Sequence, residues 1–473
     1  EKNNFSEIYK SFNYLENKSY SLNEIKKILD QINTLALSKQ YEFIDAKLEE
    51  NIIDNNKLDI KITIGESKKY YVNRINIMGN DITDENVIRN MLVVDEGDPL
   101  NVLLNKKSIN KIRASNLFAN VDIKTIDIND SQKDMSVIVE EKPTGEISAG
   151  AGVGSSGTTF TAGIKENNFN GKGIRLNTSL TVSPKTISGN INWVAPNYKY
   201  SNKSLIGDIS RSTTDLLTTS GYKNKLNLLS IGTSYEHKED FYFSPNLSFK
   251  YETLETSGSA SAELKKQADD YYDINLDYGV YYNKLNQSYA PSEGYSSSFN
   301  QQVPLFSNNY SLVNTYEFRK YNEISDQMIG SIKFYAKSIN SLSSGKDVRV
   351  SKRIKIPSHK IRGFEPGKIG PIDSDSNFVG GNYASAINIS TTLPTFLPEL
   401  QTLDLNFFID AATLWGVDYK ESLEKGINIR SSLGFSIDWT TPVGPLNFVL
   451  AQPITKESTD KTESFRFNLG TTF

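Results

Sequence analysis

The sequence contains no cysteine and only two histidines. Without cysteine the chain can form no disulfide, no thiolate nucleophile and no cysteine-ligated zinc site. His237 and His359 each stand alone, without the spacing of metal ligands. No Ser–His–Asp ordering or phosphate-binding loop is visible either. We therefore expect no metal, no cofactor and no enzymatic activity.

Strong net charge and long apolar runs are also lacking. The chain has 52 Lys and Arg against 56 Asp and Glu, a net charge of −4, so no general attraction to nucleic acid is expected. No run approaches the ~20 apolar residues that a membrane-spanning helix needs. Tyr (25) and Phe (23) are nevertheless plentiful, and 473 residues suggest two or more domains. Because the chain starts at Glu1 without Met or a signal peptide, we interpret it as a processed or trimmed fragment.

Residues 70–142 mix helical and strand periodicities and predict a small α+β module. An alternating stretch at 70–80 indicates a strand, and Thr83 is a plausible N-cap for the helical stretch that follows. A second helix is expected after a proline-containing turn. The stretches 116–128 and 134–143 then indicate two strands. The predicted order is strand–helix–helix–strand–strand.

Residues 1–69 show part of the same order. Residues 22–37 have helical spacing, and the stretches 41–52 and 57–66 are strand-like, but no convincing first strand precedes them. We infer two repeats of one module and expect the first to be incomplete at its N-terminus.

After Pro143 the chain becomes a succession of short alternating segments separated by Gly, Asn, Asp, Ser and Pro clusters. Sixteen such segments fit between 145 and 473, each with room for the ~9–11 residues that cross a bilayer as a tilted strand. A closed barrel leaves no unpaired strand edge in lipid, so we predict a 16-stranded antiparallel transmembrane β-barrel over 143–473. A soluble β-sandwich or propeller would alternate too, but it would hardly end its last strand on an exposed terminal phenylalanine, Phe473.

Several motifs resemble a known family. The helix and "NLFANV" of the module at 70–142 are similar to a POTRA (polypeptide-transport-associated) domain. Two such modules before a sixteen-stranded barrel resemble the BamA family of outer-membrane assembly proteins, in the POTRA-barrel superfamily. The resemblance covers essentially the whole chain and is carried by "GKGIRLN" (171–177), "YNKLNQSYAPSEGY" (282–295), "IRGFEPGKIGP" (361–371), "VGGNYASA" (379–386), "LNFFIDAATLWG" (405–416), "DWTTPVGPLNFVLAQP" (438–453) and "FRFNLGTTF" (465–473).

The resemblance implies an insertase that folds β-barrel proteins into the bacterial outer membrane, with its POTRA modules in the periplasm. Its partners would be outer-membrane lipids, unfolded β-barrel clients and accessory assembly lipoproteins that dock on the POTRA modules. Family members usually carry five POTRA modules, so we expect only the last two here, at 1–69 and 70–142.

The longest predicted loop, 339–381, follows the eleventh barrel strand and should be extracellular. The resemblance implies that it folds back into the lumen, where Arg362 would bind Asp410 on the barrel wall through two parallel hydrogen bonds. Gly363 would allow close approach and Phe364 would pack nearby. A second family acid falls on Ser390, which puts an additional salt bridge in doubt. Alone, Arg362 would be an ordinary solvated loop arginine.

The seam between the first and last barrel strands is the second candidate site. Glycines weaken a strand, and Gly470 could kink the last strand inward and shorten its pairing. These glycines could equally relieve crowding in the lumen, but the resemblance favours a lateral gate at which the first strand pairs with a client strand. The predicted gate residues are Gly150, Gly152, Gly154, Asn468, Gly470 and Phe473.

Two alternatives stay open at this point. One is a relative in the same superfamily, a two-partner-secretion transporter or the translocation-and-assembly protein TamA. The other, of a different class, is a passive porin or siderophore channel, although porins lack tandem periplasmic modules.

Overall fold

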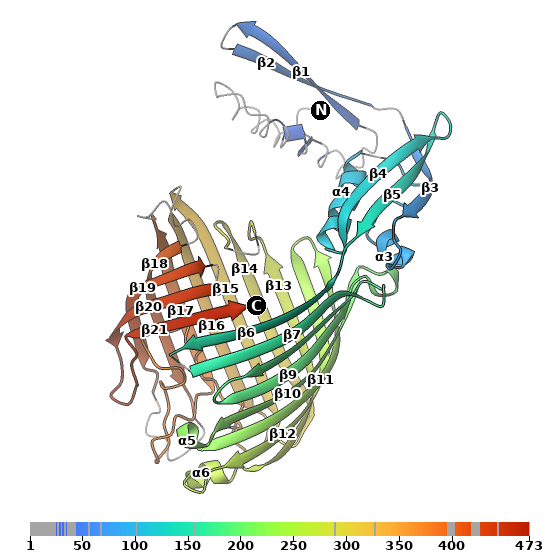
Figure 1. The fold of residues 1–473 in the computed structure, drawn as a ribbon. Helices are drawn as coiled ribbons and strands as arrows, with labels where there is room; N and C mark the ends of the chain where they lie inside the picture. Colours follow the sequence, from blue (N-terminus) through green and yellow to red (C-terminus); the bar gives the residue numbers. More distant parts are fainter. Residues whose placement is uncertain are drawn as a thin grey trace. The chain divides into compact units, whose positions relative to one another are not determined.

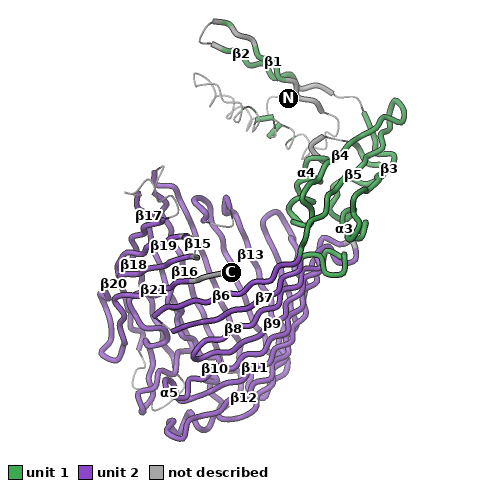
Figure 2. Tube along the Cα trace, in the orientation of Figure 1, with its two compact units in different colours: residues 1–144, 167–173 green, residues 145–166, 174–473 purple. Residues whose placement is uncertain are grey.

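A computed structural model gives the fold of the chain (Figure 1). It divides into two compact units, residues 1–144 with 167–173, and residues 145–166 with 174–473 (Figure 2). The expected boundary at 142/143 differs from this division mainly because the turn 167–173 groups with the first unit. The described residues are 25, 28–29, 31–32, 35, 44–54, 57–66, 69–100, 102–155, 157–287, 290–325, 328–394, 403–417, 426–441 and 444–472.

The second module of the first unit has the predicted element order. Strand β3 (Tyr71–Met78) is followed by α3 (Glu85–Arg89), α4 (Val102–Ala114), β4 (Phe118–Asp127) and β5 (Gln132–Glu141). The sheet order is β3-β5-β4, with β3 parallel and β4 antiparallel to β5. The core holds the apolar faces of both helices against the sheet and includes Val72, Ile75, Ile88, Ile112, Leu117, Val121, Met135 and Val137.

The preceding part of the first unit contains two antiparallel strands, β1 (Ile44–Asp54) and β2 (Lys57–Glu66). The described positions within 22–37 are helical, and Ile25, Ile28 and Ile32 are buried there. The expected absence of a first strand falls outside the described residues.

Thr83 does not cap a helix as the sequence suggested. The N-cap of α3 is Asp84, and its side chain makes no capping hydrogen bond. Thr83 instead donates its backbone N–H to Oε1 of Glu141 at 2.7 Å, and its hydroxyl accepts a hydrogen bond from Asn168 at 2.8 Å. Thr83 therefore joins the end of β5 to the turn 167–173 within the first unit.

The second unit is a closed barrel of sixteen strands in which every neighbouring pair is antiparallel and the last strand pairs with the first (Figure 1). Short helices α5 (Leu217–Ser220) and α6 (Ala262–Lys265) and the 3-10 turn η2 (Tyr198–Tyr200) lie between strands. The strands are β6 (Gly145–Gly154), β7 (Gly157–Phe169), β8 (Ile174–Val182), β9 (Thr186–Ala195), β10 (Lys203–Leu216), β11 (Tyr222–Lys238), β12 (Phe241–Thr256), β13 (Asp269–Asn283), β14 (Gly294–Ser307), β15 (Ser311–Ser325), β16 (Met328–Ser341), β17 (Tyr383–Leu393), β18 (Leu403–Trp415), β19 (Ile429–Thr441), β20 (Gly444–Thr455) and β21 (Phe465–Thr472).

The strands alternate between an apolar outer face and a polar inner face. Exposed apolar side chains such as Ile147 (81% exposed) lie outside, whereas Asp273, Asn275 and Asp410 are buried inside the unit. This alternation is typical of a barrel whose outer face meets lipid. Among the described residues, no helix is long and apolar enough to span a membrane.

The loop between β16 and β17, residues 342–382, has a core of its own. Val348, Ile354, Ile361 and Phe364 are buried with wall residues such as Leu414 of β18. Because a solvated surface loop has no reason to bury apolar side chains, this loop is an ordered part of the barrel interior.

Candidate functional site

The loop and the wall meet at Arg362 and Asp410. The guanidinium of Arg362 donates from Nε to Oδ2 of Asp410 and from Nη2 to Oδ1, both at 2.7 Å. The backbone N–H of Arg362 donates to Oδ2 as well, at 3.0 Å. Asp410 is 0% exposed and Arg362 largely buried, so the wall carboxylate is neutralised by a two-point contact that fixes orientation as well as distance.

Three neighbours complete this contact. Asn388 of β17 donates its amide to Oδ1 of Asp410 at 2.7 Å. The guanidinium lies over the ring of Phe408, 3.4 Å from its centroid, in a cation–π arrangement. The hydroxyl of Ser432 donates to the carbonyl of Arg362 at 2.6 Å. Three successive strands, β17, β18 and β19, thus hold one loop arginine.

Arg362 lies in the tip of the loop, which we define as residues 361–366. Gly363 has φ +88°, a conformation that favours glycine, and a Cβ there would lie 3.2 Å from Cβ of Ala451. Phe364 is 1% exposed. The structure therefore places Arg362, Gly363, Phe364 and Asp410 together.

The loop tip also pairs with the segment that leads into the last strand. The backbone N–H of Glu463 donates to the carbonyl of Gly363, and the backbone N–H of Glu365 donates to the carbonyl of Lys461, both at 3.0 Å. Arg466 of β21 donates to the carbonyl of Phe364 at 2.9 Å. The tip is consequently attached to the start of β21.

Ser390 carries no charge into this region. Its hydroxyl lies 2.8 Å from that of Ser331 on β16. An ion pair absent from the sequence expectations lies nearby, between Lys360 and Glu317 at 2.9 Å.

A second buried contact, at the root of the loop, was missed by the sequence reasoning. Arg349 is 0% exposed and donates to Glu252 of β12 at 3.0 Å and to Asp273 of β13. Lys352 pairs with the same Asp273 at 3.1 Å, and the Arg349 guanidinium lies 4.4 Å from the ring centroid of Tyr271. No motif marks Arg349, because its partners come from strands about 75 to 100 residues earlier in the chain.

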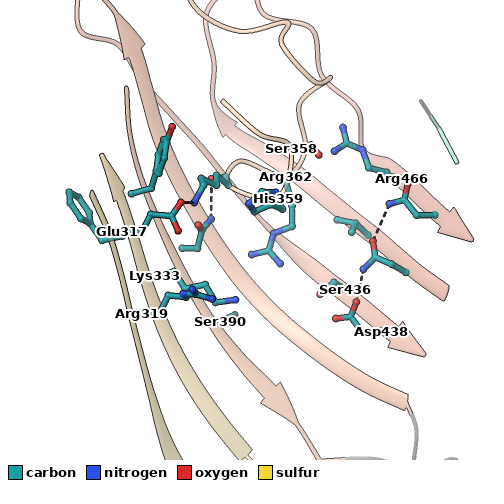
Figure 3. A pocket seen from close by; sticks show the side chains of 18 of the residues that line it. Glu317, Arg319, Lys333, Ser358, His359, Arg362, Ser390, Ser436, Asp438 and Arg466 are labelled. Carbon is teal, nitrogen blue, oxygen red and sulfur yellow. Dashed lines mark hydrogen bonds and ion pairs between the residues drawn. The ribbon is translucent and has the colours of Figure 1, made fainter. Parts of the chain in front are cut away.

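A cavity of about 370 Å³ lies beneath the loop tip. Figure 3 shows Arg362 entering it from the loop, Arg319 and Lys333 side by side near Ser390, and Asp438 on the opposite side. The cavity lining extends to Arg466 and Asn468 of β21. It therefore lies between the loop anchor and the last strand.

The seam between β21 and β6 is short. Five register pairs join them among the described residues, from Asn468↔Gly154 to Thr472↔Gly150, compared with ten between β6 and β7. Residues 145–149 of β6 have no β21 partner within the described ranges. Within the described residues, half of the first strand is therefore unpaired on its seam side.

The predicted gate residues fall on this seam in a specific register. Gly152 faces Gly470, and Asn468 faces Gly154, where a Cβ would lie 2.8 Å from the carbonyl of Phe467. Pairing of β21 with β6 continues through Gly470 to Thr472, whereas its pairing with β20 runs from Phe465 to Leu469 and ends directly before Gly470 among the described residues. Phe473 lies outside the described residues.

Comparison with known families gives two matches. A family model described as "Omp85 superfamily domain" matches residues 168–473. A POTRA model, described as "Surface antigen variable number repeat", matches residues 70–142.

Curated relatives carry the name outer membrane protein assembly factor BamA. The protein from Neorickettsia risticii is 26% identical over 89% of this chain and 57% of its own length. That from Neisseria meningitidis serogroup B is 22% identical over 99% of this chain and 65% of its own length. The chain thus spans 57% to 65% of the length of these relatives.

Solved structures share the fold. The crystal structure of BamA from Haemophilus ducreyi lacking POTRA domains 1–3 has a TM-score of 0.78 at 23% identity, covering 99% of this chain and 97% of that one. CdiB from Acinetobacter baumannii has a TM-score of 0.58 at 11% identity, covering 100% and 87%.

Proposed function

Because the chain belongs to the Omp85 superfamily, we propose that it is an insertase that folds and inserts β-barrel proteins into the bacterial outer membrane. In this proposal the barrel lies in that membrane and residues 1–142 lie in the periplasm as two POTRA modules. The names of the curated relatives, which are assembly factors, support the choice.

The short seam is the observation that carries the mechanism. A client strand would pair with residues 145–149 of β6, whose backbone groups have no β21 partner among the described residues. Separating β21 from β6 breaks the five register pairs that the described residues make, whereas separating β6 from β7 would break ten. The β6–β21 interface would therefore open sideways before the β6–β7 interface, and client folding with burial of apolar surface would supply the free energy.

The loop would keep this weak seam in register. Arg362 attaches the loop to β18, and the backbone pairs of Gly363 and Glu365 attach the tip to the segment before β21. We propose that Arg362, Gly363, Phe364 and Asp410 form an anchor that stabilises the C-terminal wall while the seam opens. The POTRA modules would bind nascent clients along sheet edges and dock accessory lipoproteins.

The likeness to CdiB leaves a transporter of the same superfamily as the second candidate. Its TM-score is lower than that of the Haemophilus ducreyi structure, and the curated relatives reported above are named as assembly factors rather than transporters. A passive channel is supported less, because residues of the 342–382 loop are buried in the barrel interior.

Reconstitution tests the proposal. The protein with its full complement of modules is placed in liposomes with purified accessory factors, and folding of a urea-denatured barrel client is followed by its heat-modifiable band. Insertase activity predicts faster folding than in empty liposomes. Equal rates would contradict the proposal, and export of a client without its insertion would favour the transporter.

A further inference from the structure

The cavity beneath the loop tip carries an excess of positive charge. Five cationic side chains line it, against three carboxylates. The cations are Arg319, Lys333, Lys360, Arg362 and Arg466.

Three of these cations have carboxylate partners. Lys360 pairs with Glu317 at 2.9 Å, and Arg466 pairs with Glu463. Arg362 is bound to Asp410. The remaining lining carboxylate, Asp438, accepts hydrogen bonds from two asparagine amides, Asn447 at 2.7 Å and Asn406 at 3.2 Å.

Arg319 and Lys333 differ from these three cations in having no carboxylate partner among the described residues. They face each other directly across β15 and β16, and both side chains are exposed. Within the described part of the chain, no carboxylate lies at ion-pair distance from either one. Like charges directly opposite each other on two strands are unfavourable, so an anion bound between them would remove a repulsion as well as gain two attractions.

Resting on the proposed function, we propose that Arg319 and Lys333 form an anion site that binds a carboxylate of the incoming polypeptide. The carboxylate would come from an acidic side chain or from the chain terminus. A guanidinium and an ammonium provide charge-assisted hydrogen bonds to such a group, and the hydroxyl of Ser390, which also lines the cavity, offers another donor.

The position of the cavity favours a polypeptide as the ligand. Its lining continues from Arg319 and Lys333 to Asn447 of β20 and Asn468 of β21. Asn468 pairs with Gly154 of β6 at one end of the seam. A chain engaged at the seam can therefore reach the two cations without leaving the cavity. The volume of about 370 Å³ accommodates several side chains.

The test measures equilibrium binding, not insertion. A labelled ten-residue peptide with one Asp and a free C-terminal carboxylate is titrated against the full chain in detergent micelles by fluorescence anisotropy. Two further peptides carry Asn in place of Asp, or an amidated C-terminus, and show which carboxylate binds. We expect Arg319→Gln with Lys333→Gln to weaken binding of the charged peptide about tenfold, the sum of two modest ion pairs, and to leave a fully neutral peptide unaffected.

Two more variants control for changes in folding. Lys337→Gln removes a cation from the same face of β16, outside the cavity lining, and should leave binding unchanged. Ser390→Glu places a carboxylate beside both cations and should abolish peptide binding while raising the thermal stability. A heat-modifiable band identical to wild type shows that each barrel is intact.

Several outcomes would overturn the site. One is equal affinity of wild type and the double variant for the charged peptide. Another is binding of inorganic phosphate without binding of the peptide. Failure of the reconstituted protein to speed client folding, with peptide binding intact, would count against the proposed function and leave the anion site standing.

Discussion

At the residue scale, the buried Asp410 explains why Arg362 is needed. Asp410 is 0% exposed and receives two hydrogen bonds from the Arg362 side chain. Removing one partner of a buried ion pair leaves an uncompensated charge, at a cost of about 3–5 kcal/mol. We therefore expect Arg362→Ala to lower the temperature at which the barrel band unfolds in a heat-modifiability gel, while membrane insertion persists.

A double variant separates the effect of the uncompensated charge from the effect of lost packing. Arg362→Met with Asp410→Leu removes both charges, so much of the lost stability should return. If the double variant is as unstable as the sum of the single ones, the ion pair does not explain the effect.

Arg349 gives a second residue-scale prediction. It is 0% exposed and is shared between Glu252 and Asp273. Arg349→Met leaves Asp273 with Lys352 and Ser307, and leaves Glu252 without an ion-pair partner among the described residues. We expect a thermal destabilisation at least as large as that of Arg362→Ala, measured in the same gel.

Lys346→Met serves as an exposed control. Lys346 lies on the same loop, its Nζ is hydrogen-bonded to the carbonyl of Asn308, and its substitution should change the stability little.

We expect Glu141 to make the POTRA domain at 70–142 sensitive to acid. Burial alone would raise the pKa of this carboxyl, but hydrogen bonds from Thr83 and the backbone N–H of Ile82 outweigh it and lower the pKa below 4.5. A lowered pKa means that the stabilisation is present above pH 4.5 and is lost as the pH falls through the folded-state value.

Hydrogen exchange of the 80–90 segment in the full chain measures this effect. Protection should fall on acidification in wild type, after correction for intrinsic exchange. Glu141→Gln should show low protection already at neutral pH and little further change. A wild-type profile that stays flat with pH would contradict the assignment.

At the element scale, the seam between β6 and β21 has half as many described register pairs as the interface between β6 and β7, and its register determines where a crosslink can be placed. Val153 faces Leu469 across β6 and β21. Directly opposite positions in antiparallel strands are within disulfide reach. We expect Val153→Cys with Leu469→Cys to block client folding when oxidised and to restore it when reduced, as measured in the liposome assay.

The neighbouring interface provides the matched control. Ala149→Cys with Ala162→Cys joins β6 to β7, which are already held by ten register pairs. Oxidation there should leave activity unchanged. Full activity of the oxidised seam variant would exclude seam opening from the mechanism.

At the scale of the barrel, the 342–382 loop is fixed at both ends of its path. Arg349 holds its root to β12 and β13, and Arg362 holds its tip to β18. Because a loop fixed to walls on separate parts of the barrel obstructs the lumen, we expect low conductance in a planar bilayer. Arg349→Met combined with Arg362→Met should release the loop and raise the conductance. Large, steady conductance of the wild type would favour the passive channel.

Much of this architecture follows from the sequence by itself. Alternation with period two predicted sixteen strands and a closed barrel, because lipid admits no unpaired edge, and the switch between helical and strand periods predicted the order of the module at 70–142. The motif "RGF" and the acid at Asp410 were identified by resemblance, since neither has a local signal of its own.

Only the tertiary structure decided what depends on contacts between distant segments. Arg349 meets Glu252 and Asp273 because the loop folds into the lumen, and no periodicity encodes that meeting. The register of the seam, the pairing of the loop tip with the segment before β21, and the juxtaposition of Arg319 and Lys333 likewise depend on how strands are aligned. Local patterns determine which face of a strand is apolar, whereas ion pairs, register and cavities arise from the closure of the whole barrel.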